Sequence, residues 1–552
     1  MQETIYAIGD VLVDDLSALS PATATAFGVR GYDHLWGDYG PSGIEATRAR
    51  LLRAKADVGQ LPAAADRWDD LARRVLLDYV EIHVSEIDSG DRYRDLNNVA
   101  SPLQVFRETF DLMPTNSVEG WGDILSRLEL LPEALAGYQA TLDEGRRRGL
   151  MAARRQVKAG IEQAAHSAGA DSWFSHVSTD YESLEFSEPE VTVALAGAAA
   201  GARAAFGAFA QYLETEYLPD ASSVDGVGPE RYARAAARFL GTTIDPLDTY
   251  QWGWGEVDRL WERMESVASV LDPDATIDEV LARLRREPAV SRGEFVELMV
   301  ERQRRALAEL DGTHFDIPEQ IRRVEVKIAP RGGALGAYYT GPSEDFERAG
   351  TVWYSFGDES LIPTYDQVST AYHEGFPGHH LQVGVQVGLS SRVSRFHRML
   401  FWLSGYGEGW ALYAERLMDE LGYLERPEYE MGFLVSQMLR ACRVVIDIGC
   451  HLGLAMPAGQ LFHPGEQWTF DLGVEMLERY ASLERAYAES EVTRYLGWPG
   501  QAISYKVGER VILELRDELA RRGNTKHKEF HARVLGSGPV GLDHLRELVL
   551  EK

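Results

Sequence analysis

The chain has 552 residues, of which 45% are hydrophobic and 26% are charged. This is the composition of a globular protein, and it excludes a disordered or fibrous chain. The 86 acidic and 56 basic residues give a formal net charge of −30. Because nucleic acids and anionic membrane surfaces attract positively charged proteins, we expect neither a nucleic acid nor a membrane as a partner.

The sequence features that report on location favour the cytoplasm. The N-terminal residues lack the basic region and apolar core of a signal peptide. The most apolar stretch, residues 191–213, is rich in Ala and Gly and carries Arg203, so we interpret it as a helix of a soluble protein rather than a membrane span. The two cysteines, Cys442 and Cys450, are too few for a disulfide framework. We therefore predict a cytoplasmic protein.

Helical periodicity dominates the first 310 residues of the chain. Apolar side chains recur at helical spacing in residues 41–90, 122–168, 191–217, 229–240, 248–271, 276–286 and 292–310. Alternation of polar and apolar residues then predicts a strand at residues 323–328. A high content of Tyr, Trp and Val predicts two more, at residues 335–340 and 351–356. Helical patterns resume at about residue 364 and continue to the end. The sequence predicts a mainly α protein with a small antiparallel β-sheet.

The change of pattern near residue 311 also suggests a division of the chain. Residues 1–310 would form a helical N-terminal part, either an independent domain or one half of a cleft. Residues 311–552 would form the catalytic part, because they hold the small sheet and the motifs described next.

The most informative motif occupies residues 372–382, Tyr-His-Glu-Gly-Phe-Pro-Gly-His-His-Leu-Gln. It begins like the zinc-peptidase motif His-Glu-x-x-His, in which two histidines four residues apart on one helix hold the metal. The glutamate beside the first histidine activates the metal-bound water in such sites. His373 and Glu374 therefore indicate a metal ligand and a general base, but Pro377 stands where the second histidine belongs.

A break in the helix would restore the missing ligand. On an unbroken helix His379 would point away from the side of His373, and His380 would share that side but lie ~10 Å further along the axis. Pro377 clashes with a regular helix, and Gly378 permits backbone angles closed to other residues. A bulge or short loop at these two residues would bring His379 back to the place of the second ligand, with His380 as its competitor.

A second segment offers a third ligand. Residues 406–415, Tyr-Gly-Glu-Gly-Trp-Ala-Leu-Tyr-Ala-Glu, are typical of the start of a helix. Glu408 lies far enough after His373 to leave room for one helix, a connection and a second helix that packs on the first. Two histidines, one glutamate and a water form a typical open catalytic zinc site. We predict Glu408 as the third ligand. Glu415 is the alternative, and otherwise lies on the helix surface or behind a ligand.

Four segments together resemble a large bacterial family known as domain of unknown function 885. Besides the two motifs above, they are residues 443–451, Arg-Val-Val-Ile-Asp-Ile-Gly-Cys-His, and residues 495–508, Tyr-Leu-Gly-Trp-Pro-Gly-Gln-Ala-Ile-Ser-Tyr-Lys-Val-Gly, with Phe530-His531 near the end. Members of this family resemble zincin metallopeptidases with a mainly helical fold. The resemblance implies a zincin-like helical architecture with the sheet beside the active-site helices. It also implies His373, His379 and Glu408 as the ligands of one zinc ion per chain.

The same resemblance suggests roles for other residues. It implies Glu374 as the general base, and it makes His451 and Tyr505 candidates for stabilising the reacting oxygen. It also makes Arg443 and Lys506 candidates for binding the substrate, with Lys506 holding a substrate carboxylate.

Helical spacing and strand position leave alternatives open for several of these residues. Asp447 lies four residues from both Arg443 and His451, a spacing that favours an ordinary salt bridge or hydrogen bond. Lys506 would otherwise lie in solvent. The strand with Tyr339 would lay out an extended substrate along the edge of the sheet, or place its side chains in the sheet core.

The sequence therefore predicts a zinc-dependent hydrolase of peptide or amide bonds, with a peptidase of carboxypeptidase-like type as the leading version. Two alternatives are an amide hydrolase that acts on a small metabolite and a non-catalytic binding protein on a zincin scaffold. A di-iron carboxylate enzyme is disfavoured, because no histidine follows a glutamate at the three-residue spacing of that class.

Overall fold

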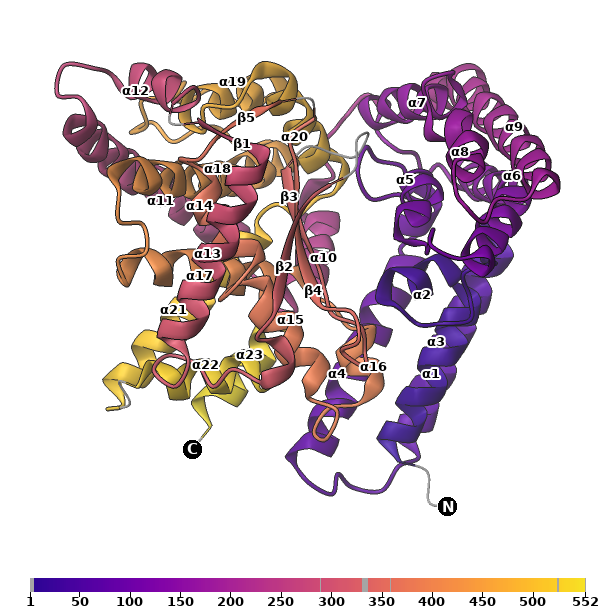
Figure 1. Ribbon diagram of the computed structural model, residues 1–552, viewed down its shortest axis with the longest axis horizontal. Helices are drawn as coiled ribbons and strands as arrows, with labels where there is room; N and C mark the ends of the chain where they lie inside the picture. Colours follow the sequence, from indigo (N-terminus) through magenta and orange to yellow (C-terminus); the bar gives the residue numbers. More distant parts are fainter. Residues whose placement is uncertain (1–3, 288, 330–335, 358, 524–525, 552) are drawn as a thin grey trace. The chain divides into compact units, whose positions relative to one another are not determined.

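A computed structural model describes residues 4–287, 289–329, 336–357, 359–523 and 526–551 (Figure 1). Most of these residues lie in helices, and the strands form only small sheets. The prediction of a mainly α fold with a small sheet is confirmed. The chain divides into two compact units, Met1–Asp225 with Ser394–Leu400, and Gly226–Val393 with Phe401–Lys552.

The boundary between the units differs from the division at residue 310 that the sequence suggests. Residues 226–310 belong to the second unit because their helices pack on later ones: α10 (Gly228–Leu240) and α11 (Pro246–Leu271) both contact α18 (Pro427–Leu452). Helices lie on both sides of residue 225, so the helical pattern is the same before and after this boundary, and only the Gly/Pro segment at residues 226–229 interrupts it.

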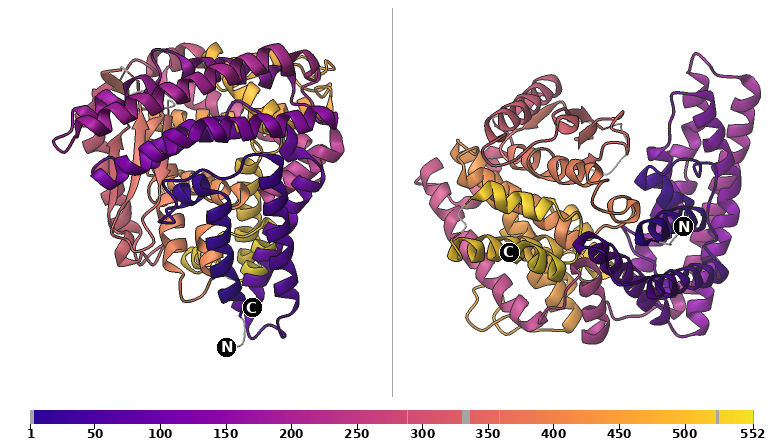
Figure 2. Two further views of the ribbon diagram at one scale, coloured as in Figure 1. Left: turned by 90° about the vertical axis from the view of Figure 1, so that its right-hand side faces the viewer. Right: turned by 90° about the horizontal axis from the view of Figure 1, so that it is seen from below.

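The first unit consists of helices. They are α1 (Ile5–Leu19), α2 (Pro21–Phe27), α3 (Pro41–Gly59), α4 (Arg67–Asp88), α5 (Pro102–Glu108), α6 (Val118–Arg147), α7 (Arg154–Ala168), α8 (Trp173–Glu182), α9 (Pro189–Tyr212) and α16 (Arg395–Met399). The helices α1, α3 and α4 pack on one another, α6, α7 and α8 pack on α9, and the left view of Figure 2 shows long purple helices lying across the indigo ones. The buried face of α9, with Leu195, Phe206 and Phe209, belongs to a core that α6, α7 and α8 share.

The apolar helix noted in the sequence is α9. Within the described residues, Pro189–Asp220 is the one stretch that is long and apolar enough to cross a membrane by length and composition, and 33% of its most apolar window is buried. The core helix of a soluble protein can share this composition. In this unit α9 packs against three helices.

The second unit holds the small sheets and the other helices. Besides α10, α11 and α18, these helices are α12 (Ile277–Leu284), α13 (Arg292–Leu310), α14 (Gln367–Glu374), α15 (His379–Gly388), α17 (Ser404–Glu420), α19 (Phe470–Tyr480), α20 (Arg485–Gly497), α21 (Ser504–Arg521), α22 (His527–Leu535) and α23 (Leu542–Leu550). A two-stranded antiparallel sheet pairs β1 (Ala289–Ser291) with β5 (Leu361–Pro363), neither of which the sequence predicts.

The larger sheet is mixed rather than antiparallel, which corrects one part of the prediction. Its order is β2 (Val324–Ile328), β4 (Gly350–Ser355), β3 (Gly336–Thr340), with β3 antiparallel and β2 parallel to β4. The β3–β4 hairpin folds back so that β4 lies beside β2, and these two strands then run in the same direction. Alternation of side chains predicts that strands exist but not their order. Leu335, which the predicted second strand includes, lies outside the described residues.

Helix α17, which carries Glu408, packs closely on α21 and on the two helices of the His373 motif. Gly409 of α17 faces Gly508 of α21, and a Cβ atom added to Gly409 would lie 2.6 Å from the backbone of Gly508. The two helices therefore approach to backbone contact, which only glycine allows. Both α14 and α15 also contact α17, so the segment that carries His373 packs beside the segment that carries Glu408.

Candidate metal centre

The helix that carries the first motif ends directly after its glutamate. Residues 375–378 separate α14 from α15, which is the interruption that the sequence predicts. A Cβ atom at Gly378 would lie 1.9 Å from the carbonyl oxygen of His373, so no larger residue fits there. Trp410 of α17 fixes the connection from the other side, because its indole N–H donates to the carbonyl oxygen of Pro377 at 2.9 Å.

The interruption brings three ligand atoms together. The Nε2 atoms of His373 and His379 lie 3.4 and 3.5 Å from Oε2 of Glu408, and one ligand atom of each residue lies within 4.8 Å of the other two. Atoms bound to a tetrahedral zinc ion at about 2.0–2.1 Å are separated by roughly 3.3–3.4 Å, so the two short distances suit zinc. Two imidazoles and a carboxylate are also a donor set that zinc accepts. The three residues therefore fit the metal that the sequence predicts.

A buried carboxylate holds the ring of His373. Glu415 accepts a hydrogen bond from Nδ1 of His373 at 2.7 Å and another from the hydroxyl of Ser369, and its side chain is 1% exposed. In a neutral ring this contact would place the proton on Nδ1 and leave the lone pair of Nε2 for a metal ion. Glu415 thus lies behind a candidate ligand rather than on the helix surface, and Glu408 occupies the ligand position.

His380 is held away from the cluster by its own partners. Its Nε2–H donates to the carbonyl oxygen of Ile321 at 2.7 Å, and its Nδ1 accepts from the hydroxyl of Tyr339 at 3.0 Å. Burial lowers the pKa of His380 to about 4, so the ring is neutral at neutral pH. Both of its nitrogens are engaged, and of the two adjacent histidines it is His379 that reaches Glu408.

Burial and neighbouring charges set the ionisation of two glutamates. Burial raises the pKa of Glu374, and the neighbouring imidazoles oppose this effect. Burial would also raise the pKa of Glu408, but hydrogen bonds with the two histidines hold it well below its usual range. Glu408 is therefore ionised, as a metal ligand must be. Glu374 has the higher proton affinity that suits a general base.

A cavity of about 780 Å³ adjoins the cluster. Its wall includes the three candidate ligands and Glu374, together with Tyr339 of β3, Arg443 of α18 and Tyr505 of α21. This volume is in the range of pockets that hold small organic ligands. The structure brings seven of the nine predicted site residues to this wall, and His451 and Lys506 do not contribute to it.

A carboxylate of the protein compensates the positive charge of Arg443. Its Nη2 and Nε donate to Oε2 of Glu491 at 2.7 and 3.1 Å, and Nε also donates to the hydroxyl of Tyr495 at 3.3 Å. The salt bridge to Asp447 that helical spacing favours does not form. Asp447 instead accepts a hydrogen bond from the hydroxyl of Tyr232 at 2.7 Å. Arg443 reaches the cavity wall with its charge already compensated.

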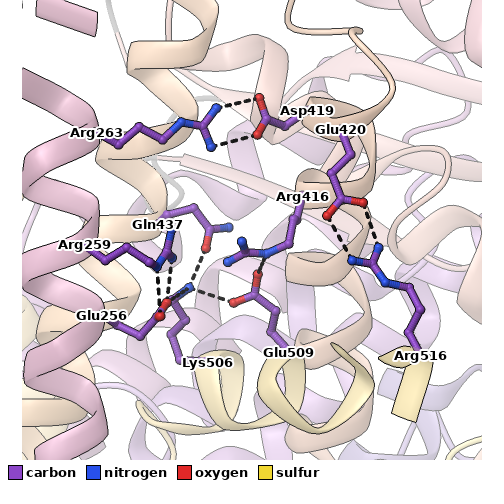
Figure 3. Close-up of polar contacts among 10 residues, drawn as sticks. All are labelled: Glu256, Arg259, Arg263, Arg416, Asp419, Glu420, Gln437, Lys506, Glu509 and Arg516. Carbon is purple, nitrogen blue, oxygen red and sulfur yellow. Dashed lines mark hydrogen bonds and ion pairs between the residues drawn. The ribbon is translucent and has the colours of Figure 1, made fainter. Parts of the chain in front are cut away.

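Lys506 lies in a buried charge network, neither at the cavity wall nor in solvent (Figure 3). Its ammonium group donates to Glu509 at 2.7 Å, to Glu256 of α11 at 3.2 Å and to the amide oxygen of Gln437 of α18 at 2.8 Å. Glu509 also accepts a hydrogen bond from Arg416 of α17 at 2.6 Å. The network joins four helices, and two carboxylates compensate the charge of Lys506.

His451 is a buried side chain of the helix core. Its Nε2–H donates to the carbonyl oxygen of Tyr495 at 3.0 Å, and its Nδ1 accepts from the backbone N–H of Val227 at 3.4 Å. Burial lowers the pKa of His451 to about 4. Both nitrogens are engaged in the core, so neither is available to a reacting oxygen. Of the two residues predicted for that role, Tyr505 is the one that the cavity exposes.

Two residues of this region are absent from the sequence-based prediction. Ser369 precedes His373 by one helical turn and bonds Glu415, and Arg440 lines the cavity one turn before Arg443. Both stand at helical spacing from a predicted residue, which is the signal that could have identified them.

Comparison with known proteins places the chain in a family. The model of a family described as "Bacterial protein of unknown function (DUF885)" matches residues 21–549. The chain belongs to this family. The resemblance that the motifs suggest is thereby confirmed for nearly the whole chain. Curated proteins give no match.

Two solved structures share the fold of this family member. A "putative lipoprotein" from Colwellia psychrerythraea has a TM-score of 0.83 and 21% identity, over 99% of this chain and 98% of its own. A "putative lipoprotein of unknown function" from Shewanella oneidensis has a TM-score of 0.75 and 18% identity, over 100% of both chains. At these identities the likeness shows the fold alone.

Proposed function

We propose that the protein is a zinc-dependent hydrolase of peptide or amide bonds, with one zinc ion per chain. The observation that carries this proposal is the convergence of His373, His379 and Glu408 beside Glu374 at one cavity wall. Three protein ligands of this kind leave a fourth position open, as catalytic zinc requires. Zinc at such a site polarises a carbonyl group and lowers the pKa of water.

Residues of the protein supply proton transfer and orientation. Glu374 takes the proton of the attacking water, since its carboxylate lines the cavity beside the ligands and burial raises its pKa. The same carboxyl group then delivers this proton to the leaving amine. Tyr505 lines the cavity and donates a hydrogen bond to the oxyanion that develops on the carbonyl oxygen. Glu415 keeps the ring of His373 in place throughout.

An edge strand gives an extended substrate a place along the cavity. β3 lies at one edge of the three-stranded sheet, and its residues from Gly336 to Tyr339 line the cavity. Tyr338 is 47% exposed, whereas the hydroxyl of Tyr339 is engaged by His380. Peptides add to such edges through backbone hydrogen bonds. This arrangement favours a peptidase, of carboxypeptidase-like type, over a hydrolase of small metabolite amides.

Metal analysis tests the proposal. Protein purified without chelator or immobilised-metal resin should contain about one zinc ion per chain by mass spectrometry. Glu374→Gln should keep the metal and lose hydrolysis of peptide and amide libraries, and His373→Ala should lose the metal. A wild-type chain that neither contains zinc nor takes it up would refute the proposal. A zinc-loaded chain that hydrolyses nothing in a broad amide panel would favour the non-catalytic binding protein.

We also propose the cytoplasm as the location of the protein. The two similar structures are described as putative lipoproteins, which makes a membrane-associated form the alternative. Fractionation of cells that express the native gene separates these cases, because a soluble protein is recovered without detergent and a lipid-anchored protein is not.

A further inference from the structure

Two arginines of α18 line the cavity, and they differ in their partners. Arg443 is bonded to Glu491 through two nitrogens, so its charge is compensated inside the protein. Arg440 forms no ion pair with any residue that the structure describes. It donates from Nη1 to the carbonyl oxygen and the hydroxyl of Ser436, at 3.2 and 2.6 Å, and both acceptors are neutral.

The other donors of Arg440 have no acceptor in the part of the chain that the structure describes. Its Nε is buried and unpartnered, and Nη2 has no partner among the described residues either. The guanidinium carbon lies 5.8 Å from the ring centroid of Tyr505. Withdrawing a cation from water without a counterion is unfavourable. Nη2 is not among the buried atoms, so it is the donor that an anion in the cavity can reach with a charge-assisted hydrogen bond. The side chain is therefore arranged for an anion from outside the protein.

The position of Arg440 connects this anion site to the candidate chemistry. Arg440 and Glu374 line the same cavity. Ser436, which Arg440 bonds, lies 3.5 Å from the carboxylate of Glu415, the group that holds His373. An anion on Arg440 would thus lie close to the bond that is cleaved.

We propose that Arg440 binds the free carboxylate of the substrate, so that the protein cleaves peptides or N-acyl amino acids next to their carboxyl end. This inference rests on the proposed hydrolase function and adds the chemical class of the substrate to it. The substrate of an endopeptidase continues beyond the cleaved bond and would bring no charge to Arg440. The two other cations predicted to bind substrate, Arg443 and Lys506, have carboxylate partners of their own.

Matched substrates test this assignment. N-Benzoylglycyl amino acids with a free carboxyl end differ from their terminal amides only by the charge that Arg440 would bind. The zinc-loaded wild type should hydrolyse the acids with a higher kcat/KM than the amides. Arg440→Gln should lower the ratio of acid to amide by roughly 10- to 100-fold, because it removes a charge-assisted hydrogen bond. Arg440→Lys should restore part of this ratio, since it keeps the positive charge but not the geometry of the guanidinium group.

Ser436→Ala provides the matched control. It removes the hydroxyl that links Arg440 to Glu415 but leaves the positive charge in the cavity, so it should keep the ratio of acid to amide. If Arg440→Gln slows both substrates equally, Arg440 acts by positioning Glu415. That result would overturn the anion site and leave the hydrolase function standing. Thermal unfolding verifies that each variant is folded.

Binding measurements separate this inference from the proposed function. Zinc-loaded Glu374→Gln should bind the N-benzoylglycyl acids more tightly than the amides in calorimetric titrations, and adding Arg440→Gln should abolish the difference. A wild type that hydrolyses nothing but shows this preference would contradict the hydrolase and support the anion site. Equal binding of acids and amides would overturn the anion site, whether or not the wild type is an active hydrolase.

Discussion

Glu415 allows a sharp test of the candidate metal site, because it contacts a ligand without being one. Its carboxylate accepts hydrogen bonds from Nδ1 of His373 and from Ser369, and it is almost fully buried. In Glu415→Gln the side chain keeps its size and can still accept a hydrogen bond from the ring. The substitution therefore removes the negative charge behind the ring and little else.

Two estimates of the effect agree. Replacing a carboxylate that supports a metal-bound histidine weakens metal binding by roughly 10- to 100-fold, which equals about 1.4–2.7 kcal/mol. A hydrogen bond to a charged group contributes about 1.5–3 kcal/mol, and the separation of 2.7 Å between Nδ1 and Oε1 is typical of such bonds. We therefore expect Glu415→Gln to raise the zinc Kd by one to two orders of magnitude.

Competition with a chromophoric zinc chelator measures this Kd directly. Glu420→Gln is the matched control, since Glu420 lies on the same helix but pairs with Arg516 at the surface. It should leave the zinc Kd unchanged, and Glu408→Gln should weaken binding more than either. Equal affinities of wild type and Glu415→Gln, with both proteins folded, would show that the carboxylate does not support a metal ligand.

Three further predictions follow from the geometry. His379→Ala should lose zinc and His380→Gln should keep it, by mass spectrometry, because only His379 reaches the cluster. Gly378→Ala should lower stability by roughly 1–3 kcal/mol and reduce zinc content, whereas Gly388→Ala, whose added Cβ would have its nearest neighbour at 3.9 Å, should do neither. Burial raises the pKa of Asp447 from 3.8 to about 7, so ionising this carboxyl group costs more in the folded state than in the unfolded state. The stability that the neutral carboxyl group gives the folded state is therefore lost as the pH rises through this interval. Asp447→Asn should therefore show a smaller fall in Tm than the wild type between about pH 5 and pH 8; an equal fall would contradict the assignment.

The candidate ligands could be predicted because short sequence motifs identify residues of this type. His373, Glu374 and Glu408 stand in patterns whose roles follow from spacing along helices. The choice between His379 and His380 depends instead on tertiary partners. A backbone carbonyl before β2 and a tyrosine of β3 hold His380, and neither partner is near it in the sequence.

The fold shows the same division between local and tertiary information. Alternation and the content of Tyr, Trp and Val predict the strands at 324–328, 336–340 and 350–355 to within a residue, because both are local properties. These patterns do not predict that β4 lies between β2 and β3, or that the unit boundary falls at residue 225, between two helical stretches. Both depend on which surfaces pack against one another.

Charge compensation explains why the predicted substrate-binding cations differ from the one that the structure favours. Sequence gives a charge without its partners, so Arg443 and Lys506 both resemble anion-binding residues. Their partners Glu491 and Glu509 lie on neighbouring turns and helices, and they satisfy charges that hold buried helices together. A cation that serves the fold needs such a partner, because an unpaired buried charge is unfavourable. A cation that binds an anionic ligand must have no carboxylate partner of its own before the ligand binds. Of the two arginines at the cavity wall, Arg440 is the one in this state.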